Sequence, residues 1–318
     1  MAVELTTSAE SKRFANGFGT KYSGIWVVAG ARSPFGRVNG SLGKVNCTQL
    51  AQVVGNEALE RSSIDRKTID QVVFANVHPS SVDALFLPRH VVLGLGLKEE
   101  TPALLVQRIC GSGIQVVSTA ADEIVAGRAR AALVGGADST TLTPTVQFGG
   151  RMGYDFGRSP GFKDLYFEAL TDSYIGKPLG NTAEKLAEDY KITRQQVDQF
   201  AYESHSRARQ AVDSGLLDEE IVPFESGGNG LKLKIRGKKI ERDETPRSDI
   251  SLESMSKLPA VFKKDGVQTA GNSCALADGA AALVIAGDDE VKKQGLKPLG
   301  RLVSVGVCGV DPSVMGIG

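Results

Sequence analysis

The sequence predicts an α/β protein whose central sheet is parallel or mixed, with a mostly helical insertion in the middle of the chain. Two observations predict this fold. Before residue 142 and after residue 278, short and continuously apolar segments alternate with segments of helical periodicity, a pattern typical of strands buried between layers of helices. Between these regions, helix-start signals and charged loops replace the apolar segments. A chain of 318 residues is long enough for two domains and a large core.

The apolar segments predict strands at 25–29, 72–75, 104–106, 131–134, 280–286 and 302–306. Apolar residues at helical spacing predict helices at 48–61, 81–93, 114–126 and 288–295. We expect the pair Gly135-Gly136 to end the fourth of these strands. Residues 1–23 are polar, so we expect a flexible N-terminal extension there, with an organelle-targeting segment as the less favoured alternative.

Two capping boxes mark helix starts in the insertion. Asn181 and Glu184 form the first, and Thr193 and Gln196 form the second. The second box opens a helix with apolar residues on one face, which we expect to end at Gly215. Residues 232–247 are highly charged and predict an exposed hairpin or loop.

Composition argues against several functions. The 37 basic and 37 acidic residues balance, so no net field recruits nucleic acid or an anionic membrane. The chain contains no uninterrupted apolar run of about 18 residues, so we expect no membrane span. Cys47, Cys110, Cys274 and Cys308 are too few and too scattered for a disulfide framework, and their spacing fits no zinc site. We therefore expect reduced thiols, no metal, and a cytoplasmic location, with an organelle matrix as the alternative.

Cys110 is the strongest candidate for a catalytic residue. An apolar, strand-like segment stops at this cysteine, and the chain turns through Gly111 and Gly113 into an amphipathic helix. The unpaired N–H groups and the dipole of a helix N-terminus favour a thiolate at this position. Because the thiolate is the nucleophilic form of cysteine, the sequence predicts nucleophilic catalysis at Cys110, with a buried inert thiol as the alternative.

Seven segments, taken in order, resemble the thiolase family. They are ARSPFG at 31–36, CGSG at 110–113, GGAD at 135–138, NTAE at 181–184, DETPR at 243–247, TAGN at 269–272 with DGAA at 278–281, and MGIG at 315–318. The resemblance implies a thiolase-like βαβαβαββ layered fold with an inserted loop domain. It also implies acyl transfer between a 3-ketoacyl-CoA and coenzyme A (CoA), or the reverse Claisen condensation of acetyl-CoA. In either direction Cys110 is the nucleophile and no separate cofactor is needed, because CoA is a substrate of the cleavage and a product of the condensation.

The resemblance also implies domain limits, an assembly and a CoA site. We expect an N-terminal thiolase domain at 24–141 and 275–297, a CoA-binding loop domain at 142–274, and the start of an incomplete C-terminal domain at 298–318. We expect a homodimer or homotetramer. The residues that the resemblance places at the CoA substrate are Arg247, Ser254, Phe262, Ala270, Cys274, Leu170 and Met315.

These positions have distinct expected roles. Arg247 matches an arginine at the nucleotide end of CoA, where a guanidinium stacks on adenine and binds phosphate oxygens. Ser254 matches a hydroxyl near the adenine. Phe262 matches an apolar residue of the pantetheine tunnel, for which ordinary core packing is the alternative. Met315 matches a methionine beside the reactive sulfur, and Cys274 stands where the family has a serine that contacts pantetheine.

The family carries further elements downstream of the position that matches Gly318. They include a Gly-His-Pro histidine that activates the nucleophile and a second cysteine that acts as general acid and base. We therefore expect this chain to be a shortened thiolase, and we do not expect His78, His90 or His205 to replace the missing base. A non-catalytic CoA-binding protein of the same fold is one alternative. A ketoacyl-synthase-like condensing enzyme is another, against which the CoA-loop signature at Arg247 argues.

Overall fold

The structure, a computed structural model, describes residues 7–15, 17–158, 161–225, 235 and 239–318. The chain divides into two compact units. Unit 1 comprises Met1–Leu142, Gly215–Thr245 and Leu276–Cys308, and unit 2 comprises Thr143–Ser214, Pro246–Ala275 and Gly309–Gly318.

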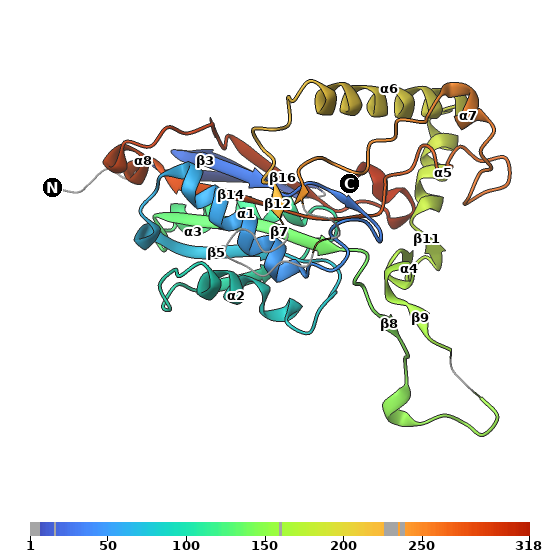
Figure 1. The fold of residues 1–318 in the computed structure, drawn as a ribbon, viewed down its shortest axis with the longest axis horizontal. Helices are drawn as coiled ribbons and strands as arrows, with labels where there is room; N and C mark the ends of the chain where they lie inside the picture. Colours follow the sequence, from blue (N-terminus) through green and yellow to red (C-terminus); the bar gives the residue numbers. More distant parts are fainter. Residues whose placement is uncertain (1–6, 16, 159–160, 226–234, 236–238) are drawn as a thin grey trace. The chain divides into compact units, whose positions relative to one another are not determined.

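Unit 1 is built on a mixed sheet, to which the described residues contribute seven strands in the order β15-β3-β14-β7-β5-β6, with β4 paired to β14 (Figure 1). The strands are β3 (Ile25–Arg32), β4 (Gly36–Arg37), β5 (Ile69–Ala75), β6 (Ala103–Val106), β7 (Ala131–Ser139), β14 (Ala277–Gly287) and β15 (Gly300–Arg301). Strand β5 runs parallel to β6 and β7, whereas β14 is antiparallel to β3 and β7. The prediction of a parallel or mixed sheet is therefore confirmed, in its mixed form.

Helices cover both faces of this sheet. Successive side chains of a strand point to opposite faces, and in β5 Val72 and Phe74 pack in one core cluster while Val73 and Ala75 pack in another. The first cluster lies against α1 and α2, and the second lies against α3. The helices and 3-10 turns of unit 1 are α1 (Cys47–Ser62), η1 (Arg66–Thr68), η2 (Ala84–Phe86), α2 (Leu87–Gly94), α3 (Ser112–Val125) and α8 (Asp288–Gln294).

One expected strand end is wrong. Strand β7 does not stop at Gly135-Gly136 but continues through both glycines to Ser139. The reason is close packing, because a Cβ at Gly135 would overlap the carbonyl oxygen of Ala281 on the neighbouring strand and lie 2.6 Å from the ring of Phe74. Gly135 therefore lets the strands approach, and the continued strand carries Asp138 to the end of the sheet.

The expected flexible extension is also wrong for the described part of residues 1–23. Strands β1 (Ser8–Phe14) and β2 (Gly17–Ser23) pair as an antiparallel hairpin, and β2 also pairs with β16 (Ser304–Cys308). The buried Tyr22 anchors this small sheet in the α3 core cluster, and its hydroxyl donates to Oδ1 of Asp122 at 2.7 Å. In β2 the buried Thr20 and Tyr22 alternate with exposed neighbours, which is the pattern of a strand with one buried face. The mostly polar composition of this segment made that pattern hard to recognise in the sequence.

The buried hydroxyl of Tyr22 makes a pH-dependent contribution to stability. Burial, together with the hydrogen bond to Asp122, raises the pKa of Tyr22 to about 12 from an ordinary 10.0. The contribution of the neutral phenol is therefore complete below pH 10 and is lost as the pH rises from 10 through 12. We expect the stability advantage of the parent over Tyr22→Phe to shrink by about 1 kcal/mol between pH 9 and pH 11, measured by urea unfolding. A constant difference across that range would contradict this assignment.

Unit 2 is mostly helical. Its helical elements are η3 (Gly150–Met152), α4 (Leu165–Ala169), α5 (Gly180–Asp189), α6 (Arg194–Asp213), α7 (Leu252–Ser256) and η4 (Pro312–Ile317). Short strand pairs join them: β8 (Thr145–Val146) with β9 (Lys163–Asp164), and β10 (Thr171–Asp172) with β11 (Lys177–Pro178). The capping box of Thr193 and Gln196 is confirmed at the start of α6, and Gly215 follows the helix with a φ of +73°.

The other capping box is wrong. Helix α5 has Leu179 at its N-cap, without a side-chain cap. Asn181 instead donates from Nδ2 to the carbonyl oxygen of Phe262 at 3.2 Å, and the buried Glu184 accepts from the backbone N–H groups of Val267 and Gln268. Both side chains are therefore used to hold the 262–268 segment on α5, a long-range role that local spacing cannot reveal.

The two units differ from the expected domains at two places. Residues 215–245, expected in the loop domain, belong to unit 1, where β12 (Phe224–Glu225) pairs with β13 (Lys239–Ile240). Of the predicted exposed hairpin at 232–247, residues 232–234 and 236–238 lie outside the described part, whereas Ile240 is buried and Asp243 makes a bidentate ion pair with Arg32. Within the expected 298–318 segment, β15 joins the central sheet and η4 belongs to unit 2. That these residues begin a further domain stays a prediction.

Candidate active site

The candidate nucleophile lies on a turn between β6 and α3. Cys110 directly precedes Gly111, the N-cap of α3, and its side chain is exposed. Ser112 holds the turn, because its Oγ accepts from the N–H of Arg108 at 2.7 Å and donates to the carbonyl oxygen of Ile109 at 2.6 Å. The expected strand–turn–helix placement of Cys110 is therefore present, with the thiol at the helix end where unpaired N–H groups gather.

The residue before the nucleophile is strained. Ile109 has a φ of +45°, a left-handed backbone conformation that costs a β-branched residue roughly 1–3 kcal/mol. Two further bonds hold this geometry: the N–H of Gly111 donates to Arg108 at 3.0 Å, and Nε of Arg108 donates to Gln115 at 2.9 Å. Such strain persists only where the surroundings fix the chain, and it is typical of functional turns.

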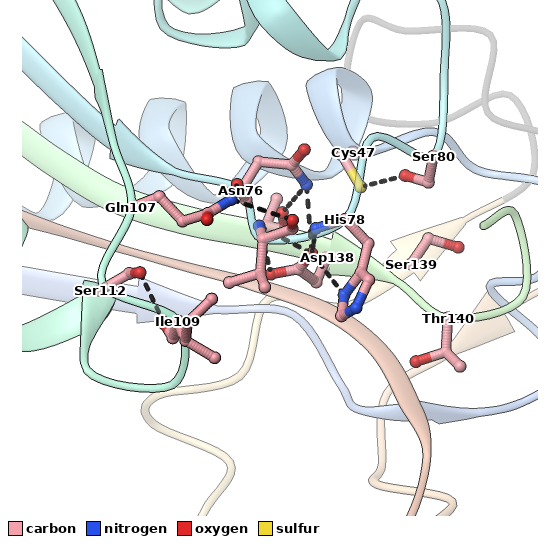
Figure 2. A network of polar contacts seen from close by, with 12 residues as sticks. Cys47, Asn76, His78, Ser80, Gln107, Ile109, Ser112, Asp138, Ser139 and Thr140 are labelled. Atoms are coloured by element: carbon pink, nitrogen blue, oxygen red, sulfur yellow. Dashed lines mark hydrogen bonds and ion pairs between the residues drawn. The ribbon is translucent and has the colours of Figure 1, made fainter. Parts of the chain in front are cut away.

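Polar residues from three parallel strands lie beside this turn (Figure 2). The carboxyl ends of β5, β6 and β7 meet at one edge of the sheet, where ligands of α/β proteins commonly bind. Asn76 and His78 follow β5, Gln107 follows β6, and Asp138 lies near the end of β7. Burial raises the pKa of the Asp138 carboxyl, although backbone N–H groups of His78 and Val77 counteract it. Asn76, Gln107 and Asp138 were not predicted from the sequence as site residues, although Asp138 closes the GGAD segment.

The four cysteines have different environments. All four, each within the described residues, are free thiols; Cys47 is buried, whereas Cys110, Cys274 and Cys308 are exposed. Burial raises the pKa of the Cys47 thiol to about 12, and its sulfur lies 3.0 Å from Oγ of Ser80. Cys47 is therefore an inert core thiol, which leaves Cys110 as the exposed cysteine at the start of a long helix.

The seven expected CoA residues all lie in unit 2, whereas Cys110 lies in unit 1. Arg247 is half-exposed, and its guanidinium forms an ion pair with Asp249 at 3.2 Å, which raises the pKa of Arg247. Ser254 belongs to a capping box at the start of α7, where its Oγ accepts from the N–H of Ser251 at 2.9 Å. Both side chains are therefore engaged locally, yet both remain open to solvent.

Three of the expected CoA residues, Phe262, Leu170 and Met315, lie beside α5 within unit 2. The ring of Phe262 packs directly on Gly180, where a Cβ would overlap it. Leu170 is half-buried, and its carbonyl oxygen accepts from the N–H of Leu179 just before α5. Met315 is 40% exposed on η4, which packs on α5 through Gly316 and Leu186. The structure thus brings these three expected residues to one helix.

Ala270 and Cys274 are exposed on a loop that buried polar residues fix. Nδ2 of Asn272 donates to the buried carboxylate of Asp198 at 2.8 Å, and Arg194 forms an ion pair with that same carboxylate at 2.7 Å. Oδ1 of Asn272 accepts from the N–H of Thr269 at 2.7 Å. Asp198 and Arg194 were missed by sequence reasoning because they lie in an ordinary helical pattern.

The histidines have separate environments. His78 belongs to the polar network, with Nδ1 3.9 Å from the Asp138 carboxylate. His90 stacks on Phe86 and lies 3.5 Å from Asp83. His205 is partly buried, and its Nδ1 accepts from the backbone N–H of Arg247 at 3.4 Å.

The described residues provide neither a metal site nor a membrane-spanning helix. In that part of the chain, His, Cys, Asp and Glu side chains form no group of three or more suited to hold a metal ion. No helix among the same residues has the length and hydropathy needed to span a membrane.

Together, the fold and the turn define an α/β protein with an exposed cysteine at a helix N-terminus and a separate, mostly helical unit. A family model described as "Thiolase, N-terminal domain" matches residues 25–289. Human mitochondrial 3-ketoacyl-CoA thiolase is 40% identical over 299 residues, which cover 93% of this chain and 73% of the relative. Beta-ketothiolase BktB from Cupriavidus necator is 39% identical, with coverage of 92% and 73%.

Solved structures of thiolases are also similar to this chain. The crystal structure of human mitochondrial 3-ketoacyl-CoA thiolase in complex with CoA has a TM-score of 0.85 and 36% identity, and it covers 98% of this chain and 74% of that one. The acetyl-CoA acetyltransferase structure from Syntrophomonas wolfei has a TM-score of 0.84 and 35% identity, with coverage of 95% and 73%. This chain belongs to the thiolase family, and it spans about three quarters of the length of these relatives.

Proposed function

We propose that this protein transfers acyl groups between CoA thioesters, with Cys110 as the nucleophile. In the degradative direction the Cys110 thiolate attacks the 3-keto carbon of a 3-ketoacyl-CoA, and the bond between C2 and C3 breaks. The leaving carbanion takes a proton to become acetyl-CoA, and an acyl thioester remains on Cys110. The thiol of a second CoA then attacks that thioester and restores Cys110. No electron is gained or lost, so the proposal requires CoA substrates but no redox cofactor.

The observation that carries this proposal is the exposed Cys110 on a strained turn at the N-terminus of α3. Cysteine suits acyl transfer because it is both a good nucleophile and a good leaving group. The charge that develops on the carbonyl oxygen requires fixed donors, and the N–H of Cys110 is one candidate. The names of the relatives support a thiolase over a ketoacyl-synthase-like condensing enzyme.

A thiolysis assay tests the proposal against a non-catalytic CoA-binding protein. Acetoacetyl-CoA and a longer 3-ketoacyl-CoA are offered with free CoA, and cleavage is followed by absorbance. Turnover that requires Cys110 supports the enzyme. Calorimetric binding of CoA, without turnover or acylation, would instead favour the non-catalytic alternative.

Arg247 is proposed to bind the nucleotide end of CoA. Its half-exposed guanidinium is held by Asp249 and is available for a phosphate oxygen. We expect Arg247→Ala to weaken CoA binding about tenfold, since a charge-assisted hydrogen bond contributes roughly 1.5–3 kcal/mol. Isothermal titration with CoA measures this loss. Arg207→Ala is the matched control, because Arg207 is an exposed arginine paired with Glu203 on α6. Equal affinities of the two variants would contradict the role of Arg247.

A homodimer or homotetramer is proposed from the exposed edge at β6. Among the described strands, β6 ends the central sheet, and its edge can accept another strand. Leu85, Phe86 and Leu104 are exposed in this region, and the first two line a groove with residues 99–103. We expect Leu104→Lys to lower the mass measured by analytical ultracentrifugation towards that of a monomer. An unchanged assembly would contradict pairing at this edge.

The location is proposed from the relatives. Because several of them are named mitochondrial, we propose the organelle matrix rather than the cytoplasm. Fluorescence of the full chain with a C-terminal tag tests this, and a diffuse cytoplasmic signal would overturn it.

A further inference from the structure

Asp138 connects β7 to the loop that follows β5. Its Oδ1 accepts from Nδ2 of Asn76 at 3.2 Å, from the N–H of Val77 at 3.1 Å and from the N–H of His78 at 3.0 Å. Asn76 is buried, and its Nδ2 also donates to the carbonyl oxygen of Ala137 at 2.8 Å. One carboxylate oxygen therefore fixes three consecutive residues of the loop at 76–78 (Figure 2).

The same loop contacts the chain that leads to the nucleophile. Nε2 of Gln107 donates to the carbonyl oxygen of Val77 at 3.1 Å and lies 3.5 Å from that of Asn76. Gln107 stands three residues before Cys110. A continuous set of hydrogen bonds thus runs from Asp138 through Val77 to Gln107 and the nucleophile turn.

The turn that carries Cys110 is held at both of its ends. Ser112 and Gln115 hold its helical end, whereas Gln107 holds the end that leaves β6. Between these supports lies Ile109, whose φ of +45° is unfavourable for isoleucine. Without Gln107 the backbone before Cys110 can relax, and the sulfur then leaves its place at the start of α3.

We propose that Asp138 is a positioning residue for Cys110, acting as a hydrogen-bond acceptor through the 76–78 loop and Gln107. This inference rests on the proposed function, because it concerns the placement of the same nucleophile. We argue for the acceptor role because all three donors reach Oδ1, and only Val77 has a second, longer contact with Oδ2 at 3.3 Å. Nδ1 of His78 lies 3.9 Å from the carboxylate, beyond hydrogen-bond distance.

The test measures the rate at which iodoacetamide alkylates Cys110 in the full chain at neutral pH, read by peptide mass spectrometry. Cys308, an exposed thiol on β16, is the internal reference. We expect Asp138→Ala to slow the alkylation of Cys110 about tenfold, because the sulfur then leaves the helix N-terminus, whose N–H groups favour the nucleophilic form of cysteine. Asp138→Asn keeps one acceptor oxygen for the three donors, so we expect the alkylation rate of Cys110 in this variant to stay within about threefold of the parent's rate. Asp70→Ala, at the other end of β5 beside Arg130, leaves the rate unchanged.

Gln107→Ala provides a second variant, at a side chain that is exposed. We expect Gln107→Ala to slow the alkylation of Cys110 to a similar degree. The double variant with Asp138→Ala should be little slower than either single variant, because both residues act through the same set of hydrogen bonds. The inference is overturned if Asp138→Ala leaves the alkylation rate of Cys110 unchanged, or if Asp138→Asn slows it as much as Asp138→Ala does. It is also overturned if the effects of the two single variants multiply in the double variant, or if the rate at Cys308 changes equally. If the parent's Cys110 reacts no faster than its Cys308, the proposed function fails as well.

Discussion

Replacing Cys110 by serine is expected to reduce thiolysis by about three orders of magnitude or more. Serine at this position keeps the shape of the turn but is a much weaker nucleophile at neutral pH, and loss of a nucleophile is among the costliest changes in an enzyme. The turn itself is held by backbone and Ser112 contacts that do not use the sulfur. We therefore expect the loss in kcat without a loss of fold. Steady-state kinetics with a 3-ketoacyl-CoA, together with circular dichroism, measures both.

Cys308→Ser is the matched control for this variant. Cys308 is an exposed, free thiol in unit 1, on β16. It should retain the parent's activity. Equal losses in the two variants would show that general damage, rather than the missing nucleophile, explains the effect.

Gly135→Ala is expected to produce a large loss of stability, on the order of 3 kcal/mol or more. A Cβ at this position overlaps the carbonyl oxygen of Ala281 and approaches the ring of Phe74 to 2.6 Å. Neither neighbour can move easily, because Ala281 lies in β14 at the centre of the sheet and Phe74 is fully buried. Urea unfolding measures the change in the free energy of unfolding.

Gly136→Ala is the control from the next position of the same strand. There a Cβ would meet its nearest atom, the carbonyl oxygen of Ala75, at an ordinary 3.4 Å. We expect a change of less than about 1 kcal/mol, because added contact and reduced backbone freedom in the unfolded state offset any strain. Similar losses in both variants would contradict the packing account.

Local patterns predicted the main elements of the fold. Continuous apolar segments located β3, β5, β7 and β14, because strands covered on both faces require apolar residues throughout. The capping box at Thr193 located the start of α6 for an equally local reason. Glycine was harder to interpret, since Gly135 marks close strand packing rather than a strand end. Its role depends on Ala281 and Phe74, which are distant in sequence.

In the candidate site, too, some features follow from local sequence and others depend on distant residues. The position of Cys110 between β6 and α3 follows from its neighbours in the sequence. The polar residues beside it do not, because Asp138 and Gln107 reach the 76–78 loop only after three strands align. Glu184 shows the same limit: its spacing from Asn181 predicts a cap, whereas its carboxylate holds backbone N–H groups of Val267 and Gln268, about eighty residues away.

The central claim is that Cys110 accepts an acyl group from a CoA thioester. The most direct measurement incubates the full chain with acetyl-CoA, quenches it in acid and locates any added acetyl group by peptide mass spectrometry. We predict acetylation of Cys110, with Cys47 unmodified because its thiol is buried. Absence of acetylation at Cys110, or equal acetylation of Cys274 and Cys308, would contradict the account.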